Sequence, residues 1–434
     1  MPEKKIALVW FKTNLRLRDN ECLFRALAEN DEVIPFYCFD DQVLQTNKFG
    51  FKKTGNIRLN FLKENLLQLD NELRKAGSGL VLLHGSPETE IVKLASKYFA
   101  TSIYSEKEVA PEELQTAKKT AAELAKVNCE FLTFECRNLF HTADLPFPVS
   151  GLPEIFTEFR KKVEKATVIR PLFTKPLSIA SPPISALSLT LLQELIPVNV
   201  QTDPRAAMMP LAFGAAAAHQ RLHYYFYQTK ALSTYKETRN GLVGEKYSTK
   251  FSAWLAMGCI SAKEIYYEIK AYEDLHRANE STYWLFFELL WRDYFGFCME
   301  KNPLRYFSKS GNQQTKATDS KVLDTELHKW INGQTGEPFI DANMTELKLT
   351  GFMSNRGRQN VASYLCNDLK LDWRYGAAYF EQQLIDYDVC SNWCNWAYVA
   401  GVGNDPRANR YFNIAKQAAT YDADKRFRQL WAAG

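Results

Sequence analysis

The stretch LKLDWRYGAAYFEQQLIDYDVCSNWCNWAYVAGVGNDPRANRY, residues 369–411, carries the strongest signal in this chain of 434 residues. It sets three tryptophans among acids, asparagines and glycines. Two upstream stretches have the same character, ELLWRDY at 288–294 and MSNRGRQN at 353–360. A core built only for packing would hold fewer polar and charged residues. The pattern favours a cavity that holds a large planar redox cofactor and offers a stacking surface to a second molecule.

The composition is that of a globular protein with two or three domains. Hydrophobic residues make up 46% of the chain and charged residues 24%, which is ordinary for this class. The net charge of +4 permits a nucleic-acid partner without requiring one. No run of about twenty apolar residues occurs, so we expect no membrane span. The chain begins MPEKKIALVWF, which enters a strand pattern directly, so we expect no targeting segment and a cytoplasmic location.

The nine cysteines are spread singly along the chain. Cys390 and Cys394 are four residues apart, but no further Cys or His pair completes a zinc pattern. We therefore expect reduced cysteines, as in a cytosolic protein, and no metal site.

Residues 4–136 alternate between short apolar runs and amphipathic helices. The strand-like runs are 5–11, 32–39, 80–84, 101–105 and 129–135, and the helical patterns are 57–75, 87–98 and 111–126. This alternation predicts a five-stranded, parallel, doubly wound sheet with a crevice at the carboxyl ends of its strands. The strand–helix junctions contain neither GxGxxG nor a P-loop, which argues against a standard dinucleotide or triphosphate site.

Residues 137–205 read as a connector, because their prolines and serines make a long helix improbable. From residue 206 onward the apolar spacing is helical. Helices are predicted at 214–231, 252–257, 261–273, 280–300, 323–332, 340–349, 354–368, 373–386 and 407–417. We thus predict an α/β domain at 1–136, a connector at 137–205 and an all-α domain at 206–434.

Long motifs in a fixed order resemble the photolyase/cryptochrome family, and most closely its DASH-type cryptochromes. They include WFKTNLRLRDN (10–20), YSTKFSAWLAMGCIS (247–261), TYWLFFELLWRDYF (282–295), GFMSNRGRQNVASYL (351–365) and GVGNDPRANRYFN (401–413). Such motifs occur along nearly the whole chain. The resemblance implies an N-terminal α/β antenna domain, a long connector and a helical domain that buries FAD in a U-shaped form.

Hydroxyls and a lysine stand just before the apolar run that begins at Ala253. By themselves Ser248, Thr249, Lys250 and Ser252 could be an ordinary helix cap or an anion-binding loop. The resemblance identifies them with the loop that binds the FAD phosphates. It also implies that Tyr235, further upstream, contacts the cofactor.

Four polar residues correspond to positions around the flavin ring. The resemblance implies that Arg358 and Asp386 form an ion pair beside the ring, since buried charges need partners. It places Asn392 opposite the reactive ring nitrogen, where a neutral amide can donate or accept a hydrogen bond. Asp388 is expected to bind the cofactor too.

The resemblance further implies a chain of tryptophans for electron transfer. Trp396 matches the member nearest the flavin, and Trp373 matches the middle member. The distal tryptophan should lie about ten residues before Trp330, but residues 315–322 contain none. Either Trp330 or a tyrosine substitutes for it, or photoreduction through the protein is impaired.

Helical spacing puts Glu288 and Trp291 on one face, and Asn355 and Gln359 on another. By resemblance these four residues line the space above the flavin, with Tyr398 as a further wall. Trp291 is expected to stack on a flipped pyrimidine pair, while Glu288 and Asn355 bond base edges.

Double-strand photolyases carry Met and Trp where this chain has Gln359 and Tyr398. Fewer apolar contacts to the flipped lesion should offset less of the free energy needed to flip it out of a duplex. Single-stranded DNA is therefore the expected substrate.

Three arginines, Arg239, Arg356 and Arg410, match positions that contact phosphates beside the lesion, although each alone could be an ordinary surface charge. Glu112 roughly matches an acid that holds a folate antenna, 5,10-methenyltetrahydrofolate, but it also suits the first turn of a helix. The run Ala215–Ala218 departs from the family, which has an acidic residue in this segment.

These observations predict a blue-light-driven, FAD-dependent lyase that repairs cyclobutane pyrimidine dimers in single-stranded DNA. The expected partner is single-stranded DNA with such dimers, RNA and duplex DNA being further candidates, and we expect a monomer. The same cradle would also serve a blue-light photoreceptor that signals, or a nucleic-acid-binding flavoprotein without turnover. An intact cavity at Glu288, Trp291 and Asn355 favours repair.

Overall fold

A computed structural model of the chain describes residues 4–196, 203, 205, 212–311, 324–404 and 410–432. Five parallel strands form one sheet in the order β3-β2-β1-β4-β5. Their bounds are Ile6–Phe11 (β1), Glu32–Asp40 (β2), Val81–Gly85 (β3), Ser102–Glu106 (β4) and Glu130–Phe134 (β5). The predicted doubly wound sheet is thereby confirmed.

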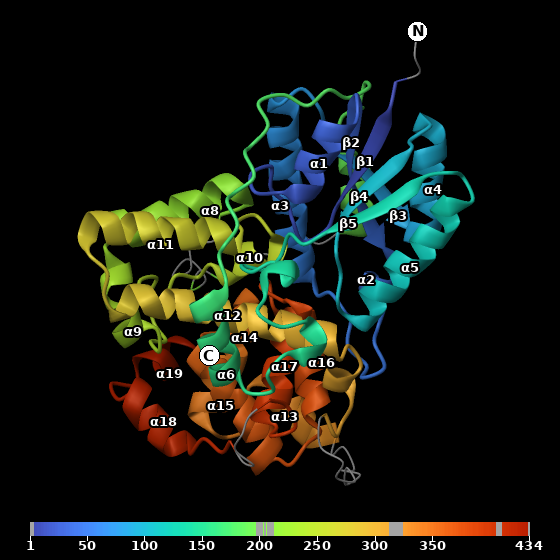
Figure 1. Cartoon of the computed structure of the whole chain (residues 1–434). Helices are drawn as coiled ribbons and strands as arrows, with labels where there is room; N and C mark the ends of the chain where they lie inside the picture. The colour runs from blue at the N-terminus through green and yellow to red at the C-terminus, as the bar shows by residue number, and fades with distance from the viewer. Residues whose placement is uncertain are drawn as a thin grey trace.

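Alternate residues of the central strand β1 point to opposite faces of the sheet. Ala7, Val9 and Phe11 join the core beneath α1 (Glu21–Glu29) and α3 (Asn56–Lys75). Leu8 and Trp10 join a second core with α4 (Pro87–Tyr98) and α5 (Pro111–Ala125). Figure 1 shows these two helix pairs on either side of the sheet. Helices α3, α4 and α5 were predicted, whereas α1 and the short α2 (Asp41–Leu44) were not.

The predicted connector contains more helix than expected. It holds α6 (Phe156–Ala166), α7 (Leu189–Leu195) and the 3-10 turns Thr142–Asp144 and Val149–Gly151. The prolines that argued against a helix begin at Pro171, after α6 has ended. Phe156, Phe159 and Val163 of α6 are buried, so this helix forms because its apolar side packs on the helical half.

The rest of the described chain is helical. Its helices are α8 (Gly214–His223), α9 (Tyr235–Thr238), α10 (Ser252–Met257), α11 (Ala262–His276), α12 (Glu280–Lys301), α13 (Asp324–Asn332), α14 (Pro338–Thr350), α15 (Asn355–Ser363), α16 (Trp373–Gln383), α17 (Val389–Val399), α18 (Ile414–Tyr421) and α19 (Arg426–Leu430). Single π-helical turns, Tyr224–Gln228 and Tyr364–Asp368, extend α8 and α15. The predicted all-α region is thus confirmed.

Two helix predictions near the C-terminus need correction. Helix α17 was not predicted, although it begins at a clear cap, where the Asp388 side chain accepts from the amide of Ser391 at 2.7 Å. The helix predicted at 407–417 is instead α18, which begins at Ile414, and residues 407–409 lie outside the described residues.

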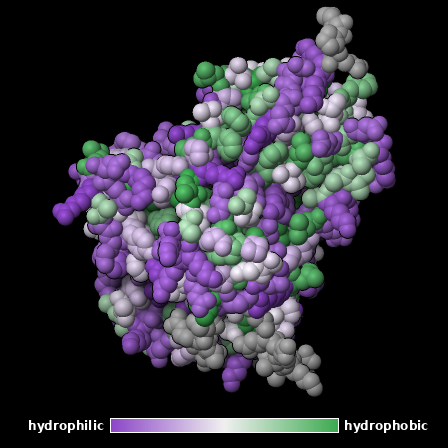
Figure 2. Space-filling model, viewed as in Figure 1, coloured by the Kyte–Doolittle hydropathy of each residue, from purple (hydrophilic) through white to green (hydrophobic). Residues whose placement is uncertain are grey.

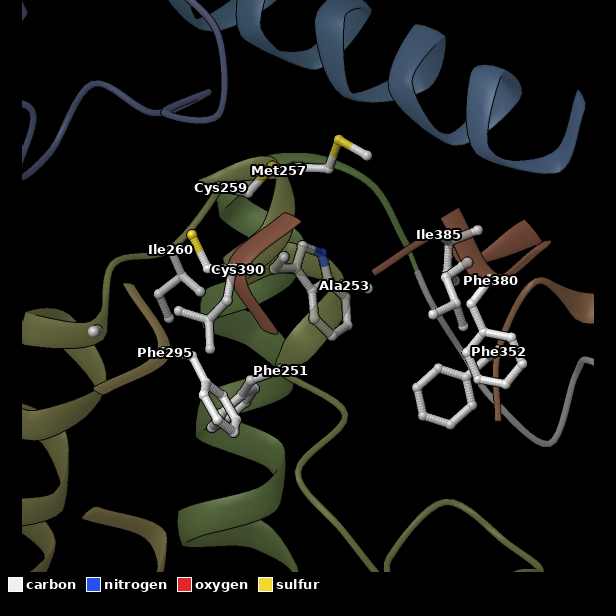
Figure 3. Close-up of a cluster of buried hydrophobic side chains, with 14 of the residues drawn as sticks. Phe251, Ala253, Met257, Cys259, Ile260, Phe295, Phe352, Phe380, Ile385 and Cys390 are labelled. Carbon is white, nitrogen blue, oxygen red and sulfur yellow. The ribbon is translucent and has the colours of Figure 1, made fainter. Parts of the chain in front are cut away.

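The core of the helical half is built around α10, α12, α16 and α17. Figure 3 shows Phe251, Phe295 and Cys390 in one group, and Phe352, Phe380 and Ile385 in another. On the face shown in Figure 2, hydrophobic residues lie scattered among hydrophilic ones. Within the described part of the chain, no helix combines the length and the apolar character that crossing a bilayer requires.

Candidate functional site

A deep cavity opens in the helical half, with walls from α10, α12, α15, α16 and α17. Its empty volume is about 1500 Å³, including the open mouth. Fourteen residues singled out from the sequence line it: Tyr235, Arg239, Ser248, Thr249, Lys250, Ser252, Glu288, Asn355, Arg358, Gln359, Asp386, Asp388, Asn392 and Trp396. Motifs far apart in the chain therefore converge on one site.

The loop before α10 holds a buried cation. Lys250 is 4% exposed and has left-handed backbone geometry, with φ of +61°. Its ammonium lies 3.6 Å from the ring centre of Tyr247 and 4.7 Å from that of Phe352. Burial lowers the pKa of Lys250 to about 7, although the Glu346 carboxyl opposes the shift. A buried ammonium held against aromatic rings suits an anionic ligand.

Other polar groups lie at this end of the cavity. The hydroxyl of Tyr247 is buried and has no hydrogen-bond partner among the described residues. Ser248 and Thr249 on this loop, and Ser252 at the start of α10, line the same space. Hydroxyls, an orphaned phenol and a buried ammonium together fit a phosphate group.

An ion pair is set into the cavity wall. Arg358 on α15 donates from Nη2 to both carboxylate oxygens of Asp386, at 3.0 and 2.7 Å, and its Nε donates to the Met353 carbonyl at 2.9 Å. The Asp386 side chain is only 1% exposed. The amide nitrogen of Asn392 donates to the Ala377 carbonyl at 3.0 Å, which fixes the amide's orientation at the same wall.

Asp388 is held by a partner that sequence reasoning missed. Arg137 donates to both of its carboxylate oxygens, from Nε at 2.9 Å and from Nη2 at 2.7 Å. Burial alone would raise the pKa of Asp388, but the Arg137 guanidinium outweighs it and holds that pKa well below its ordinary value. Gly296 of α12 provides the space for the Arg137 guanidinium, because a Cβ there would lie 2.4 Å from Arg137 Nη1. The pair fixes the start of α17, which carries Asn392 and Trp396.

Trp396 lines the cavity and belongs to a buried aromatic cluster. Its ring is perpendicular to Phe380 at 5.0 Å and to Trp330 at 6.2 Å, and a Cβ on Gly376 would lie 2.2 Å from it. Trp373 contacts Trp393 at 6.0 Å. Trp330 is fully buried and adjoins Trp396 directly, so it does not occupy a distal surface position. Residues 315–322, where a distal tryptophan was sought, lie outside the described residues.

The mouth of the cavity carries acid, amide and aromatic groups. Glu288 accepts from Arg239, and burial raises the pKa of Glu288 while the Arg239 charge opposes that shift. Trp291, one turn further along α12, does not line the cavity but stands beside it. Its ring meets that of Tyr398 edge-on at 5.7 Å and lies parallel to Phe156 at 3.7 Å. Tyr398, predicted as a further wall, does not line the cavity either.

The three predicted phosphate-binding arginines gather near this mouth. Arg410 donates to the Tyr398 hydroxyl at 2.7 Å, and Arg356 donates to Asn240 Oδ1 at 3.0 Å. Burial lowers the pKa of the Arg356 guanidinium, and the nearby charges of Arg239 and Arg410 lower it further. Arginines close enough to repel one another create a local positive potential that favours polyanions.

A second cavity, of about 830 Å³ with its opening, lies between the sheet and the helical half. Acids on its wall include Glu106, Glu108 and Glu113, and burial raises the pKa of Glu113 to about 7. Glu112, the acid predicted to hold an antenna, does not line this cavity. Its side chain is 63% exposed and pairs with Lys53, whereas Glu108 and Glu113 line the cavity. Tyr387 and Asp388 belong to both cavities.

Other sequence features lie outside both sites. Ala217 and Ala218 pack in the core, and none of Ala215–Ala218 lines either cavity. All nine cysteines are free. Among the described residues, histidines, cysteines and acids do not form groups of three or more that could hold a metal ion.

Two family models match the chain. One described as "DNA photolyase" matches residues 7–177, and one described as "FAD binding domain of DNA photolyase" matches residues 284–433. The second contains most of the first cavity's lining, from Leu285 to Val399.

Full-length relatives agree with these matches. A cryptochrome DASH of Synechocystis sp. is 45% identical over 98% of this chain and 86% of its own length. A cryptochrome DASH of Xenopus laevis is 44% identical over 98% of this chain and 82% of its own. A crystal structure of a Synechocystis sp. cryptochrome superposes with a TM-score of 0.93 at 43% identity, covering 99% of this chain and 89% of that one. An archaeal photolyase from Sulfolobus tokodaii, solved with two FAD molecules, gives 0.79 at 27% identity, covering 98% and 90%.

Proposed function

Because this chain belongs to the photolyase/cryptochrome family and is most similar to its DASH-type members, we propose that it repairs cyclobutane pyrimidine dimers with blue light and prefers single-stranded DNA. FAD binding and a general photolyase-type function follow from the family. The observation that carries the finer proposal is the mouth of the cavity. There Glu288, Asn355 and Gln359 line one space, with the Trp291 ring beside it.

The residues of the first cavity fit FAD. Lys250 and the hydroxyls of Ser248, Thr249 and Ser252 would hold its diphosphate, and the Arg358–Asp386 pair with Asn392 would face its ring system. When bound, reduced FAD excited by blue light supplies the electron that splits the dimer. Apolar walls that include Leu285 and Phe380 exclude water from that space.

The buried ammonium of Lys250 predicts how cofactor affinity depends on pH. An anionic diphosphate raises the pKa of Lys250 above its value of about 7 in the free protein, so binding takes up a proton at higher pH. We therefore expect FAD affinity to be highest below about pH 7 and to fall by up to about tenfold per pH unit above it. Titration of flavin-free protein with FAD across this range measures the slope.

Lys250→Met should bind FAD more weakly below pH 7 and with a flatter pH profile. Glu346 needs a separate control, because burial raises its pKa to about 8 and Lys250 faces it. Glu346→Gln should keep the wild-type slope. An unchanged slope in Lys250→Met would show that another group titrates.

At the mouth, the proposed roles follow from the shape of each group. Trp291 offers a planar surface on which a pyrimidine can stack, an interaction worth about 1–3 kcal/mol per base. Glu288 and Asn355 can bond polar base edges, while Arg239, Arg356 and Arg410 suit the flanking phosphates. Light supplies the driving force, so no side-chain nucleophile is needed.

Preference for a single strand rests on Gln359 and Tyr398. Gln359 lines the cavity, and Arg410 donates to the Tyr398 hydroxyl beside the Trp291 ring. Polar groups therefore stand where a larger apolar surface would stabilise the flipped lesion. Extruding a dimer from a duplex costs a few kcal/mol, and a single strand spares most of that cost.

We expect the reduced protein under blue light to split dimers in single-stranded oligo(dT) at least about tenfold faster than in the matching duplex. The remaining dimers are counted after timed illumination, with a dark sample as control. Gln359→Met should narrow the difference by speeding the duplex reaction. Equal rates on both substrates in the wild type would contradict the strand preference.

A signalling photoreceptor is the second candidate, and the cryptochrome names of the relatives favour it. A signalling photoreceptor would contain flavin but would split dimers in neither single-stranded nor duplex DNA.

For the second cavity we propose 5,10-methenyltetrahydrofolate as an antenna, held by Glu108 and Glu113. We also propose the divisions 1–136, 137–205 and 206–434 as the domain boundaries.

A further inference from the structure

One face of the Trp291 ring is covered by a side chain from outside the helical domain. Phe156, at the start of α6, stacks on Trp291 with a centroid distance of 3.7 Å and an interplanar angle of 10°. Phe156 is 5% exposed, whereas Trp291 remains partly exposed. A planar molecule can therefore stack on Trp291 only from the side opposite Phe156.

The Phe156 ring is itself fixed by its neighbours. Phe287 meets it edge-on at 5.2 Å and Tyr294 at 5.6 Å. These two residues and Trp291 lie three or four positions apart along α12, so they form one side of that helix. Phe156 is held against this side and cannot swing away without losing all three contacts.

A second point of attachment fixes α6 itself. Arg160 donates from Nη1 to the Tyr283 hydroxyl at 2.6 Å, and that hydroxyl donates to Glu164 Oε1 at 2.7 Å. Tyr283 stands two turns before Trp291 on α12. Helix α6 is therefore attached along two turns of α12, and the position of Phe156 is set by helix packing.

We propose that Phe156 is a positioning residue for base recognition: it covers one face of Trp291 and fixes the plane of the indole, which then offers a single face to a flipped pyrimidine. This inference rests on the proposed function. A parallel stack at 3.7 Å leaves the indole little freedom to tilt, so a base that stacks on it has little disorder to remove. With an aliphatic residue in place of Phe156 the indole would be freer to tilt, and the substrate would have to fix it on binding at a cost in entropy.

The test compares dark binding of single-stranded oligo(dT), with and without a dimer, by fluorescence anisotropy on FAD-loaded protein. Phe156→Leu should lose about threefold to tenfold in affinity for the dimer-containing strand, the range expected for one aromatic pair. Affinity for the undamaged strand and the slope of affinity against salt should stay unchanged, because phosphate contacts set both. Phe156→Tyr keeps a planar ring and should retain wild-type discrimination.

Phe159→Leu is the matched control, since Phe159 is buried in the same cluster and contacts Phe156 and Tyr294 rather than Trp291. Phe159→Leu should distinguish the dimer-containing strand from the undamaged strand as well as the wild type does. A loss of affinity for the dimer-containing strand equal to that of Phe156→Leu would show that the cluster is loosened as a whole and would overturn the inference. Unchanged binding by Phe156→Leu overturns it too, as does tighter binding, which would make Phe156 a cover over the stacking face. A wild type that does not distinguish the two strands overturns the proposed function as well.

Discussion

Replacing Arg358 by glutamine is expected to yield a protein that purifies without flavin and binds added FAD about tenfold to 150-fold more weakly. Asp386 would then be a buried carboxylate without its guanidinium partner. A hydrogen bond to a charged group contributes about 1.5–3 kcal/mol, and about 1.4 kcal/mol corresponds to a tenfold change in affinity. Breaking the buried ion pair also lowers the free energy of unfolding by about 3–5 kcal/mol. Flavin content by absorbance and titration of the flavin-free protein with FAD measure the effect.

Arg374→Gln is the matched control. Arg374 forms a similar bonded pair with Asp372, at 2.7 Å, but neither residue lines the cofactor cavity. This variant should keep its flavin. Adding Asp386→Asn to Arg358→Gln removes the unpaired charge, so it should restore thermal stability without restoring FAD affinity. Full flavin content in Arg358→Gln would show that the pair does not hold the cofactor.

Glu288→Gln is expected to lose repair while it keeps FAD. The substitution preserves the shape of the side chain but removes its charge and one acceptor at the mouth of the cavity. A hydrogen bond to a charged group contributes about 1.5–3 kcal/mol, so kcat/KM for the dimer should fall by about tenfold to 150-fold. Separate kcat and KM values under saturating light show whether binding or turnover is lost.

A second glutamate on the same helix provides the control. Glu280 pairs with Lys236 at the start of α12, and its side chain is 79% exposed. Exposed pairs contribute about 0–1 kcal/mol, so Glu280→Gln should repair like the wild type. If Glu288→Gln also repaired normally, Glu288 would have no part in dimer recognition.

The α/β half could be predicted from sequence because its signals are local. Each strand is a short apolar run, and the two faces of the sheet read as alternating positions along strands such as β1. Helix α17 was missed for the opposite reason. Its sequence VCSNWCNWAYV mixes asparagine and tryptophan with apolar residues, since Asn392 and Trp396 line the cavity while Cys390, Trp393 and Cys394 pack in the core. Local rules fail where a segment is shaped for a ligand.

The site was predicted where motifs carry it and missed where long-range packing does. Lys250, Arg358 and Glu288 lie within recognisable stretches, and the cavity contains them. Arg137 reaches Asp388 across 251 positions of sequence, and no local pattern announces such a contact. Phe156 is similar, because its role appears only once α6 lies on α12. At Glu112 the sequence could not separate neighbouring acids. Glu108 and Glu113, close to it in sequence, line the second cavity, whereas the Glu112 side chain is exposed.

Light-dependent repair of a single-stranded oligonucleotide by the FAD-loaded, reduced protein tests the central claim most directly. Dimers are counted after equal times under blue light and in the dark, with substrate in excess over protein. The proposed chemistry predicts that each protein molecule removes many dimers in the light and none in the dark. Equal dimer counts in the two samples, from a protein that carries its full complement of FAD, would contradict it.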